Sequence, residues 1–243
     1  CAWVTLLTGL DVDQHGVVDT CRFDAREFPG LFAEPSGSTS YQRETMFDLA
    51  SRAGLSVAGV SVPMTSPPWP VNGVLIPGVP VAEEARPPTW PPELREQVSP
   101  ISLCHADEVD RSDVASCRRY LDFDLARIPE ISRRLYEART YDLFLTVLKV
   151  PDISNHLFHA HPAIDDWRAL IDEYHERTDA ALGEVLRWVD PEAVVMVVSD
   201  HGNGPRPRQS FRVSTWLEQL GLLTRRHATG VGPRALESLQ RVY

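Results

Sequence analysis

Two short motifs in this chain carry residues of the kinds that bind metal ions. The first follows residues 193–198, a run of six apolar residues of which four are β-branched. Such a run predicts a strand buried on both faces of a parallel sheet. Asp200 and His201 come just after it, and Gly202 allows the backbone to turn sharply. Because open α/β sheets bind ligands at the carboxyl ends of their strands, this motif predicts a ligand site, whereas taken alone it could be a turn or cap.

The second motif follows another strand-like run, residues 142–148. Asp152 and His156 are four residues apart, so a helix starting near Asp152 would present both side chains on one face. Pro151 suits the first turn of such a helix. Two carboxylate and imidazole pairs form a ligand set that suits zinc and also admits manganese or iron. The alternative is that Asp152 only caps the helix and His156 is a surface histidine.

The segment between the motifs determines whether they can meet. Apolar residues recur at spacings of three and four over residues 162–189, which predicts one long amphipathic helix that ends before Pro191. A helix between two strands of one sheet forms a right-handed crossover, which leaves the strands parallel. The carboxyl ends of strands 142–148 and 193–199 would then lie on the same side of the sheet, and the two Asp/His pairs would converge.

The remaining pattern predicts an α/β fold with a mostly parallel sheet sandwiched by helices. Helices are expected up to Thr8 and over residues 40–53 and 128–138, and a buried strand over residues 57–62. Residues 63–127 are expected to form a Pro-rich loop followed by a peripheral insertion within the domain. One domain that includes residues 1–243 is the expectation for this length.

Composition narrows the classes of function. The chain has 243 residues, a formal net charge of −10 and a hydrophobic content of 43%. This charge argues against a nucleic-acid surface, because phosphate binding depends on Lys and Arg. The four cysteines have no C-x-x-C spacing, so no disulfide framework is expected. No apolar run is long enough to cross a bilayer. Oligomeric state and cellular location stay open, with a slight preference for the cytoplasm.

Five segments, in order, resemble the type I phosphodiesterase/nucleotide pyrophosphatase family of the alkaline phosphatase superfamily. They include the Thr-Gly and His-Gly stretches near the N-terminus, a Pro-rich stretch with Asn-Gly, an Asp-x-x-x-His motif, an Asp-His-Gly motif and a Trp-Leu…Gly-Leu-Leu tail. In this sequence they are residues 2–19, 62–74, 152–156, 199–202 and 211–223. The resemblance implies an alkaline-phosphatase-like fold, incomplete at both ends.

The resemblance also implies a metal-dependent hydrolase of small phosphate esters. Two divalent ions, zinc in the first place and manganese or iron as alternatives, would act in phosphoryl transfer, with ligands from Asp152, His156, Asp200 and His201. One ion would activate a Ser or Thr nucleophile and the other would stabilise the leaving oxygen.

Aligned with the family, the nucleophile falls about two residues before Cys1, and a further His ligand falls beyond Tyr243. We therefore expect an internal fragment that has no catalytic nucleophile and is inactive alone. Cys1 itself lacks the Pro and Arg context of the nucleophile of related sulfatases. Thr20 stands where pyrophosphatase relatives have a phosphate-holding Asn, which puts nucleotide-pyrophosphatase specificity in doubt. Thr20 and Asn72 are the candidate substrate-binding residues.

Two other classes of function stay open. The chain could be a non-catalytic metal-binding relative, or another enzyme of the superfamily such as a phosphomutase. Retention of both Asp/His pairs speaks against the first. Three other histidines are alternative ligands: His15 is interpreted as structural, His159 could share the face of His156, and His161 is a weaker alternative.

Overall fold

A computed structural model describes residues 2–23, 33–78, 88–98, 109–159, 161, 163–204 and 211–224. The chain divides into two compact units. The first is Cys1–Arg22 with Pro35–Asn203, and the second is Phe23–Glu34 with Gly204–Tyr243. The elements that position the candidate site all belong to the first unit.

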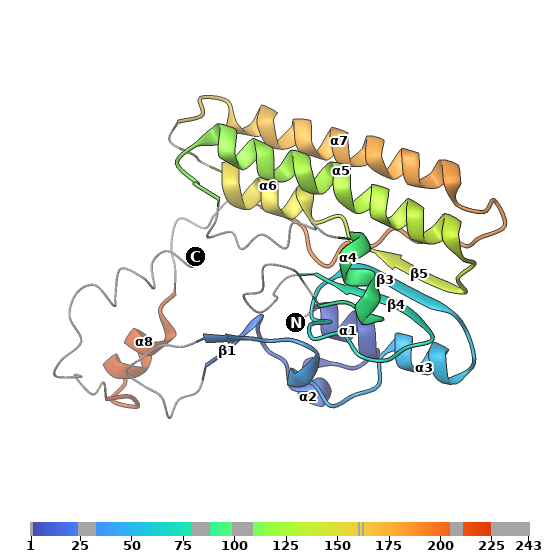
Figure 1. Cartoon of the computed structure of the whole chain (residues 1–243). Helices are drawn as coiled ribbons and strands as arrows, with labels where there is room; N and C mark the ends of the chain where they lie inside the picture. The colour runs from blue at the N-terminus through green and yellow to red at the C-terminus, as the bar shows by residue number, and fades with distance from the viewer. Residues whose placement is uncertain are drawn as a thin grey trace. The chain divides into compact units, whose positions relative to one another are not determined.

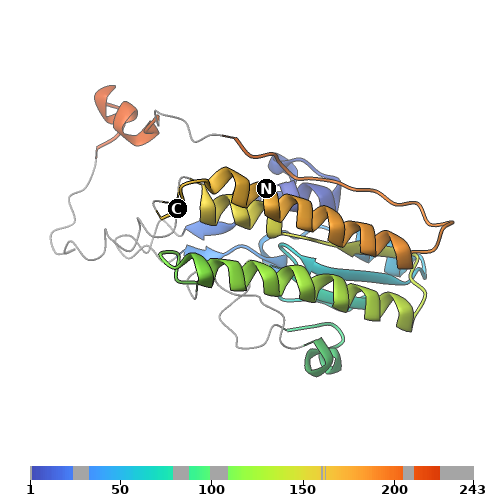
Figure 2. The same cartoon turned by 90° about the horizontal axis from the view of Figure 1, so that it is seen from above.

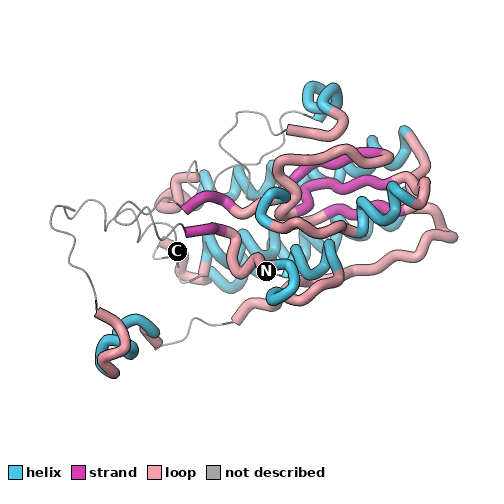
Figure 3. The backbone as a smooth tube through the Cα atoms, turned by 90° about the horizontal axis from the view of Figure 1, so that it is seen from below, coloured by secondary structure: helices cyan, strands magenta, loops and turns pink. Residues whose placement is uncertain are grey.

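A three-stranded parallel sheet forms the centre of the first unit (Figure 3). Its strands are β3 (Val57–Val62), β4 (Gly73–Pro77) and β5 (Leu143–Thr146), and their order is β4-β3-β5. Both neighbours of β3 run parallel to it, with Val57 opposite Gly73 and Leu143. Two of the predicted strands are therefore confirmed as partners in one parallel sheet.

Helix α5 (Val114–Ala138) covers one face of this sheet. Two short turns, η2 (Pro92–Leu94) and α4 (Arg95–Val98), complete the cover. The buried residues of this layer come from every second position of the strands and from the sheet-facing side of α5. They are Val60, Val74, Ile76, Leu94, Val98, Ile128 and Ile131.

Helices α1 (Ala2–Thr8) and α3 (Met46–Arg52) lie against the opposite face (Figure 1). Leu7 of α1 and Phe47 of α3 are buried there together with Val57, Val62 and Leu75 of the strands. The predicted helix 40–53 is shorter than expected, because Thr45 caps α3 by accepting a hydrogen bond from the backbone N–H of Asp48. The result is a three-layer α/β arrangement.

Helices α6 (Val150–Phe158) and α7 (Trp167–Trp188) pack beside α5, so that three helices run next to one another in both Figures 1 and 2. Their shared core includes Leu121 of α5, Phe158 of α6 and Tyr174 of α7. The predicted helices at 152 and at 162–189 are thus confirmed, with α7 beginning a few residues later, after the side chain of Asp166 caps it.

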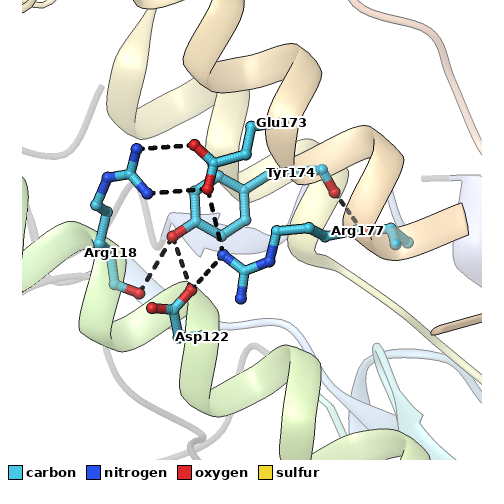
Figure 4. A network of polar contacts seen from close by, with 6 residues as sticks. Arg118, Asp122, Glu173, Tyr174 and Arg177 are labelled. Atoms are coloured by element: carbon cyan, nitrogen blue, oxygen red, sulfur yellow. Dashed lines mark hydrogen bonds and ion pairs between the residues drawn. The ribbon is translucent and has the colours of Figure 1, made fainter. Parts of the chain in front are cut away.

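A polar network joins the outer faces of α5 and α7 (Figure 4). Arg118 donates two hydrogen bonds, of 2.9 and 2.8 Å, to the carboxylate of Glu173. The Tyr174 hydroxyl and the Arg177 guanidinium both donate to Asp122 Oδ1, at 2.9 and 2.7 Å. Burial, assisted by Asp122, raises the pKa of Tyr174 to about 12. These contacts fix how the two helices align, since each bond is directional.

The other elements are short: α2 (Val12–His15), η1 (Ser38–Ser40) and a two-stranded sheet of β1 (Cys21–Phe23) and β2 (Ala33–Pro35). In the second unit the structure describes helix α8 (Val213–Gln219). None of the described helices is long and apolar enough to span a membrane.

Three parts of the expected loop and insertion 63–127 are regular structure, so that prediction was wrong there. Residues 73–77 form β4, an outer strand of the sheet, residues 92–98 form η2 and α4, and residues 114–127 are the first half of α5. The first residue of β4 is Gly73, and a larger residue would not fit there. Its backbone approaches β3 so closely that a Cβ would lie 1.8 Å from the Val57 carbonyl oxygen. Helix α5 continues through Pro129, where the sequence suggested a new start. Residues 79–87 and 99–108 lie outside the described part.

The predicted strand 193–199 was also wrong. Residues 194–199 are extended without strand pairing, and Val194 and Met196 are 91% and 79% exposed. Among the described residues, β5 is therefore an edge of the sheet. A run of apolar β-branched residues has the composition of a buried strand. To form such a strand it also needs a neighbouring strand to pair with and other elements that cover both of its faces.

Asp142 connects the start of β5 to the start of β3 through hydrogen bonds to Ser56. Its Oδ2 accepts hydrogen bonds from the Ser56 backbone N–H and hydroxyl, at 2.7 and 2.8 Å. The bond from the backbone N–H, followed by that from the hydroxyl, lowers the pKa of Asp142 below its ordinary value of 3.8. A carboxyl group with a lowered folded-state pKa stabilises the fold above the unfolded pKa and loses that effect as the pH falls.

Asp142→Asn should therefore lower the melting temperature at pH 7, and the gap to the wild type should close as the pH falls below about 3.8. Thermal unfolding followed by circular dichroism from pH 2.5 to 7 measures the gap. Asp179→Asn, at an exposed position of α7, is the matched control. A gap that stays constant across this range would contradict the assigned role.

Candidate metal centre

The structure brings the four predicted ligand residues together. Asp152 lies in the first turn of α6, and His156 follows one turn later, with its Nε2 3.4 Å from Asp152 Oδ1. His201 reaches the same oxygen from the extended segment after α7, at 4.0 Å from its Nε2. Asp200 Oδ2 is 3.6 Å from that nitrogen. The four side chains therefore form a continuous cluster beyond the carboxyl end of β5.

Asp152 is the centre of this cluster. Its Oδ1 is buried and has no hydrogen-bond partner among the described residues. The neighbouring His156 imidazole, and then the charges of His156 and His201, lower the pKa of the Asp152 carboxyl even though burial opposes them. The 3.4 Å approach of His156 is an ion-pair contact that does not reach hydrogen-bond geometry. A buried carboxylate oxygen in this state is costly unless a cation satisfies it.

The His201 ring is oriented by its own loop. Its Nδ1 lies 3.2 Å from the Gly202 carbonyl oxygen, which can only accept a hydrogen bond. The proton of a neutral ring is therefore on Nδ1, and the lone pair on Nε2 points toward Asp152 and Asp200. A backbone carbonyl that fixes the tautomer in this way is the usual second partner of a metal-ligating histidine.

Three separations between donor atoms, each from an imidazole nitrogen to a carboxylate oxygen, are close to those between the ligands of a metal ion. In the part of the chain that the structure describes, no three Asp, Glu, His or Cys side chains are already arranged as the ligands of one ion. Ligands about 2.0–2.2 Å from zinc in tetrahedral geometry would lie about 3.3–3.6 Å apart. The contacts of 3.4, 3.6 and 4.0 Å in the cluster lie within or slightly above this spacing. The donor set and its orphaned oxygen are thus compatible with a divalent ion after small side-chain movements.

A family model described as type I phosphodiesterase / nucleotide pyrophosphatase matches residues 1–242. The chain belongs to this family. No curated protein and no solved structure matches it. The family has an alkaline-phosphatase-like fold, consistent with the three-layer α/β arrangement, and its members hydrolyse phosphate esters. The resemblance stated from the five segments is therefore confirmed.

The two candidate substrate residues of this phosphodiesterase family member have partners outside the cluster. Asn72 precedes β4, at the amino end of the sheet, whereas Asp152 follows β5 at the carboxyl end. Its side-chain amide donates to the carbonyls of Gly54 and Leu55, at 3.2 and 3.0 Å. Thr20 is exposed, and its backbone N–H and hydroxyl both donate to Asp19 Oδ1. The structure thus explains Asn72 as a connector between α3, β3 and β4.

The additional histidines have other partners. His15 is buried, its Nδ1 accepts from the backbone N–H of Val17, and its Nε2 consequently donates to Thr5 Oγ1 at 3.1 Å. Burial lowers the pKa of His15. Because the imidazole donates, it cannot take a proton from Thr5, and the pair is no nucleophile and base. The structural interpretation of His15 is supported.

The two histidines after His156 are also occupied. His161 Nδ1 accepts from the backbone N–H of Ala163, and its Nε2 donates to the carbonyl of Arg111 at 2.7 Å. The His159 ring lies against Trp167, with 4.4 Å between ring centres. In the described structure, neither ring forms a hydrogen bond, ion pair or ring contact with the cluster around Asp152.

Sequence reasoning missed one buried charge next to the cluster. Lys149, three residues before Asp152, forms an ion pair of 3.0 Å with Asp124 of α5. The only available signal was a lysine between an apolar strand and the Pro-Asp of the metal motif, and spacing does not reveal its distant partner.

Asn72 allows a direct test of its structural role. Asn72→Ala removes both bonds to the turn before β3 and the bond that Arg139 donates to Asn72 Oδ1. We expect the free energy of unfolding to fall by about 1–2 kcal/mol, because exposed hydrogen bonds contribute little each. Urea titration measures this loss, and zinc titration should show unchanged affinity. A large change of zinc affinity with unchanged stability would contradict the assignment.

Proposed function

We propose that this chain carries the metal-binding half of a phosphodiesterase site, with Asp152, His156, Asp200 and His201 as ligands of divalent metal, zinc before manganese or iron. The observation that carries the proposal is Asp152 Oδ1, a buried carboxylate oxygen without a hydrogen bond and with two imidazole nitrogens within 4.0 Å. The family generally depends on metal, which agrees with this choice of cofactor.

The four residues would supply two kinds of ligand atom. Asp152 and Asp200 offer anionic oxygens, and the two imidazoles offer nitrogen lone pairs, so the set supplies both ligand types that zinc accepts. A bound divalent ion would neutralise charge on the phosphoryl oxygens and make the phosphorus more open to attack. His156 and His201 are about 60% and 50% exposed in their side chains, which leaves the open side of the cluster accessible to a small phosphate ester.

The nucleophile in this proposal is a Ser or Thr upstream of Cys1, which itself lies outside the described residues. Two described hydroxyl groups close to that end are engaged otherwise. Thr5 accepts a hydrogen bond from His15, and the Thr8 hydroxyl donates to the Val4 carbonyl at 2.7 Å. Activity is therefore to be sought in a version of the protein extended on that side, and the chain as given serves to measure metal binding.

Metal binding is tested by thermal unfolding with and without zinc. An ion at 100 times its dissociation constant stabilises the folded state by about 2.7 kcal/mol, which corresponds to roughly 5–10 °C in a domain of this size. Asp152→Ala and His201→Ala should abolish this rise. Without metal they should melt within about 2 °C of the wild type, because neither side chain is buried in the core.

The control is His175→Ala, an exposed histidine of α7 away from the cluster, which should keep the full rise. An equal zinc response in the wild type and in both ligand variants would overturn the assignment. For the extended protein, hydrolysis of bis(4-nitrophenyl) phosphate that needs metal and His201 supports the enzyme. Metal binding without turnover would favour the non-catalytic relative instead.

A further inference from the structure

The buried ion pair between Lys149 and Asp124 is the most solvent-excluded charge contact that the described structure gives next to the cluster. Lys149 Nζ is 3.0 Å from Asp124 Oδ2, and the two side chains are 9% and 1% exposed. The ring of Tyr120 lies beside the ammonium, with 5.5 Å between the ring centre and Lys149 Nζ. Burial alone lowers the pKa of Lys149, but Asp124 and Tyr120 outweigh it and the pKa lies above its ordinary value. The Lys149 ammonium is therefore charged at neutral pH.

The position of the pair relates it to the metal motif. Lys149 is the residue before α6, and its carbonyl accepts the backbone N–H of Ile153 at 3.1 Å, so its backbone forms the first turn of that helix. Asp152 belongs to the same turn. Asp124 is carried by α5, which is packed on the sheet through Ile128 and Ile131. The ion pair thus connects the start of α6 to the part of the fold that the sheet holds in place.

Apolar packing holds both ends of α6. Val150 at its start, and Leu157 and Phe158 near its end, are buried in the core shared with α5 and α7. Such packing is not directional. A buried ion pair adds little net stability compared with apolar residues of similar volume, so geometric specificity is the better reason for its presence.

We propose that Lys149 is a positioning residue, which through Asp124 fixes where α6 begins and hence where Asp152 and His156 face Asp200 and His201. The inference rests on the proposed metal site. It assigns to Lys149 no contact with the ion or the substrate.

The decisive variant removes both charges at once. Lys149→Met/Asp124→Leu leaves no unpaired buried charge, so its melting temperature without metal should equal or exceed that of the wild type. Zinc affinity, measured by calorimetry, should nevertheless fall about 10- to 100-fold, as it does when residues that orient metal ligands are lost. Hydrogen exchange of the Ile153 amide, which donates to the Lys149 carbonyl, should become faster. The control is Arg133→Met/Glu137→Leu, which removes an exposed ion pair from α5, the helix that carries Asp124.

Zinc affinity within threefold of the wild type, together with unchanged exchange of the Ile153 amide, would overturn the proposal. If the wild type itself binds no zinc or manganese, the proposed function fails, and the exchange rates alone decide whether the pair positions α6. If the double variant does not fold, Lys149→Gln/Asp124→Asn replaces it under the same criteria, since it removes both charges and keeps a polar side chain at each position.

Discussion

The parallel pairing of β5 with β3 determines where the candidate site lies, because the segment that carries the metal motif continues directly from the end of β5. The ladder runs from Val57 opposite Leu143 to Val60 opposite Thr146. Its start is held by Asp142, which accepts two hydrogen bonds from Ser56. A shift by one residue would turn the apolar side chains of β5 to the wrong layers and move α6 with it. The geometry around Asp152 therefore depends on a register that is set at the opposite end of the strand.

The parts of this arrangement that sequence could predict are those with local causes. Strand β3 is a short apolar run after a Gly stop, and it was predicted with its observed bounds. Helix α6 was predicted from Pro151 and from the spacing of Asp152 and His156, which become neighbours through one helical turn. In each case the signal and the structure involve the same few residues, so no knowledge of distant partners was needed.

The parts that escaped prediction depend on partners far away in the chain. Strand β4 has five residues in a Pro-rich stretch and is a strand because the edge of β3 is available to it. The first half of α5 looked like a polar insertion, yet its buried Cys117 and Leu121 pack against α6 and α7. Residues 193–198 show the converse, since a strongly apolar run finds no partner edge in the described structure and stays exposed. Composition reports what a segment could bury, and only the fold decides what covers it.

This difference between the two halves of the cluster has a consequence for metal binding. Asp152 and His156 sit on a helix that is held by the core of α5 and α7 and by a buried ion pair. Asp200 and His201 follow a segment without strand pairing. The ion pair between His201 and Asp152, at 4.0 Å, links the two motifs in the described structure. An ion shared by both motifs would therefore also fix the loop to α6. Part of its binding free energy would be used to order that loop, so affinity and local stability should be coupled.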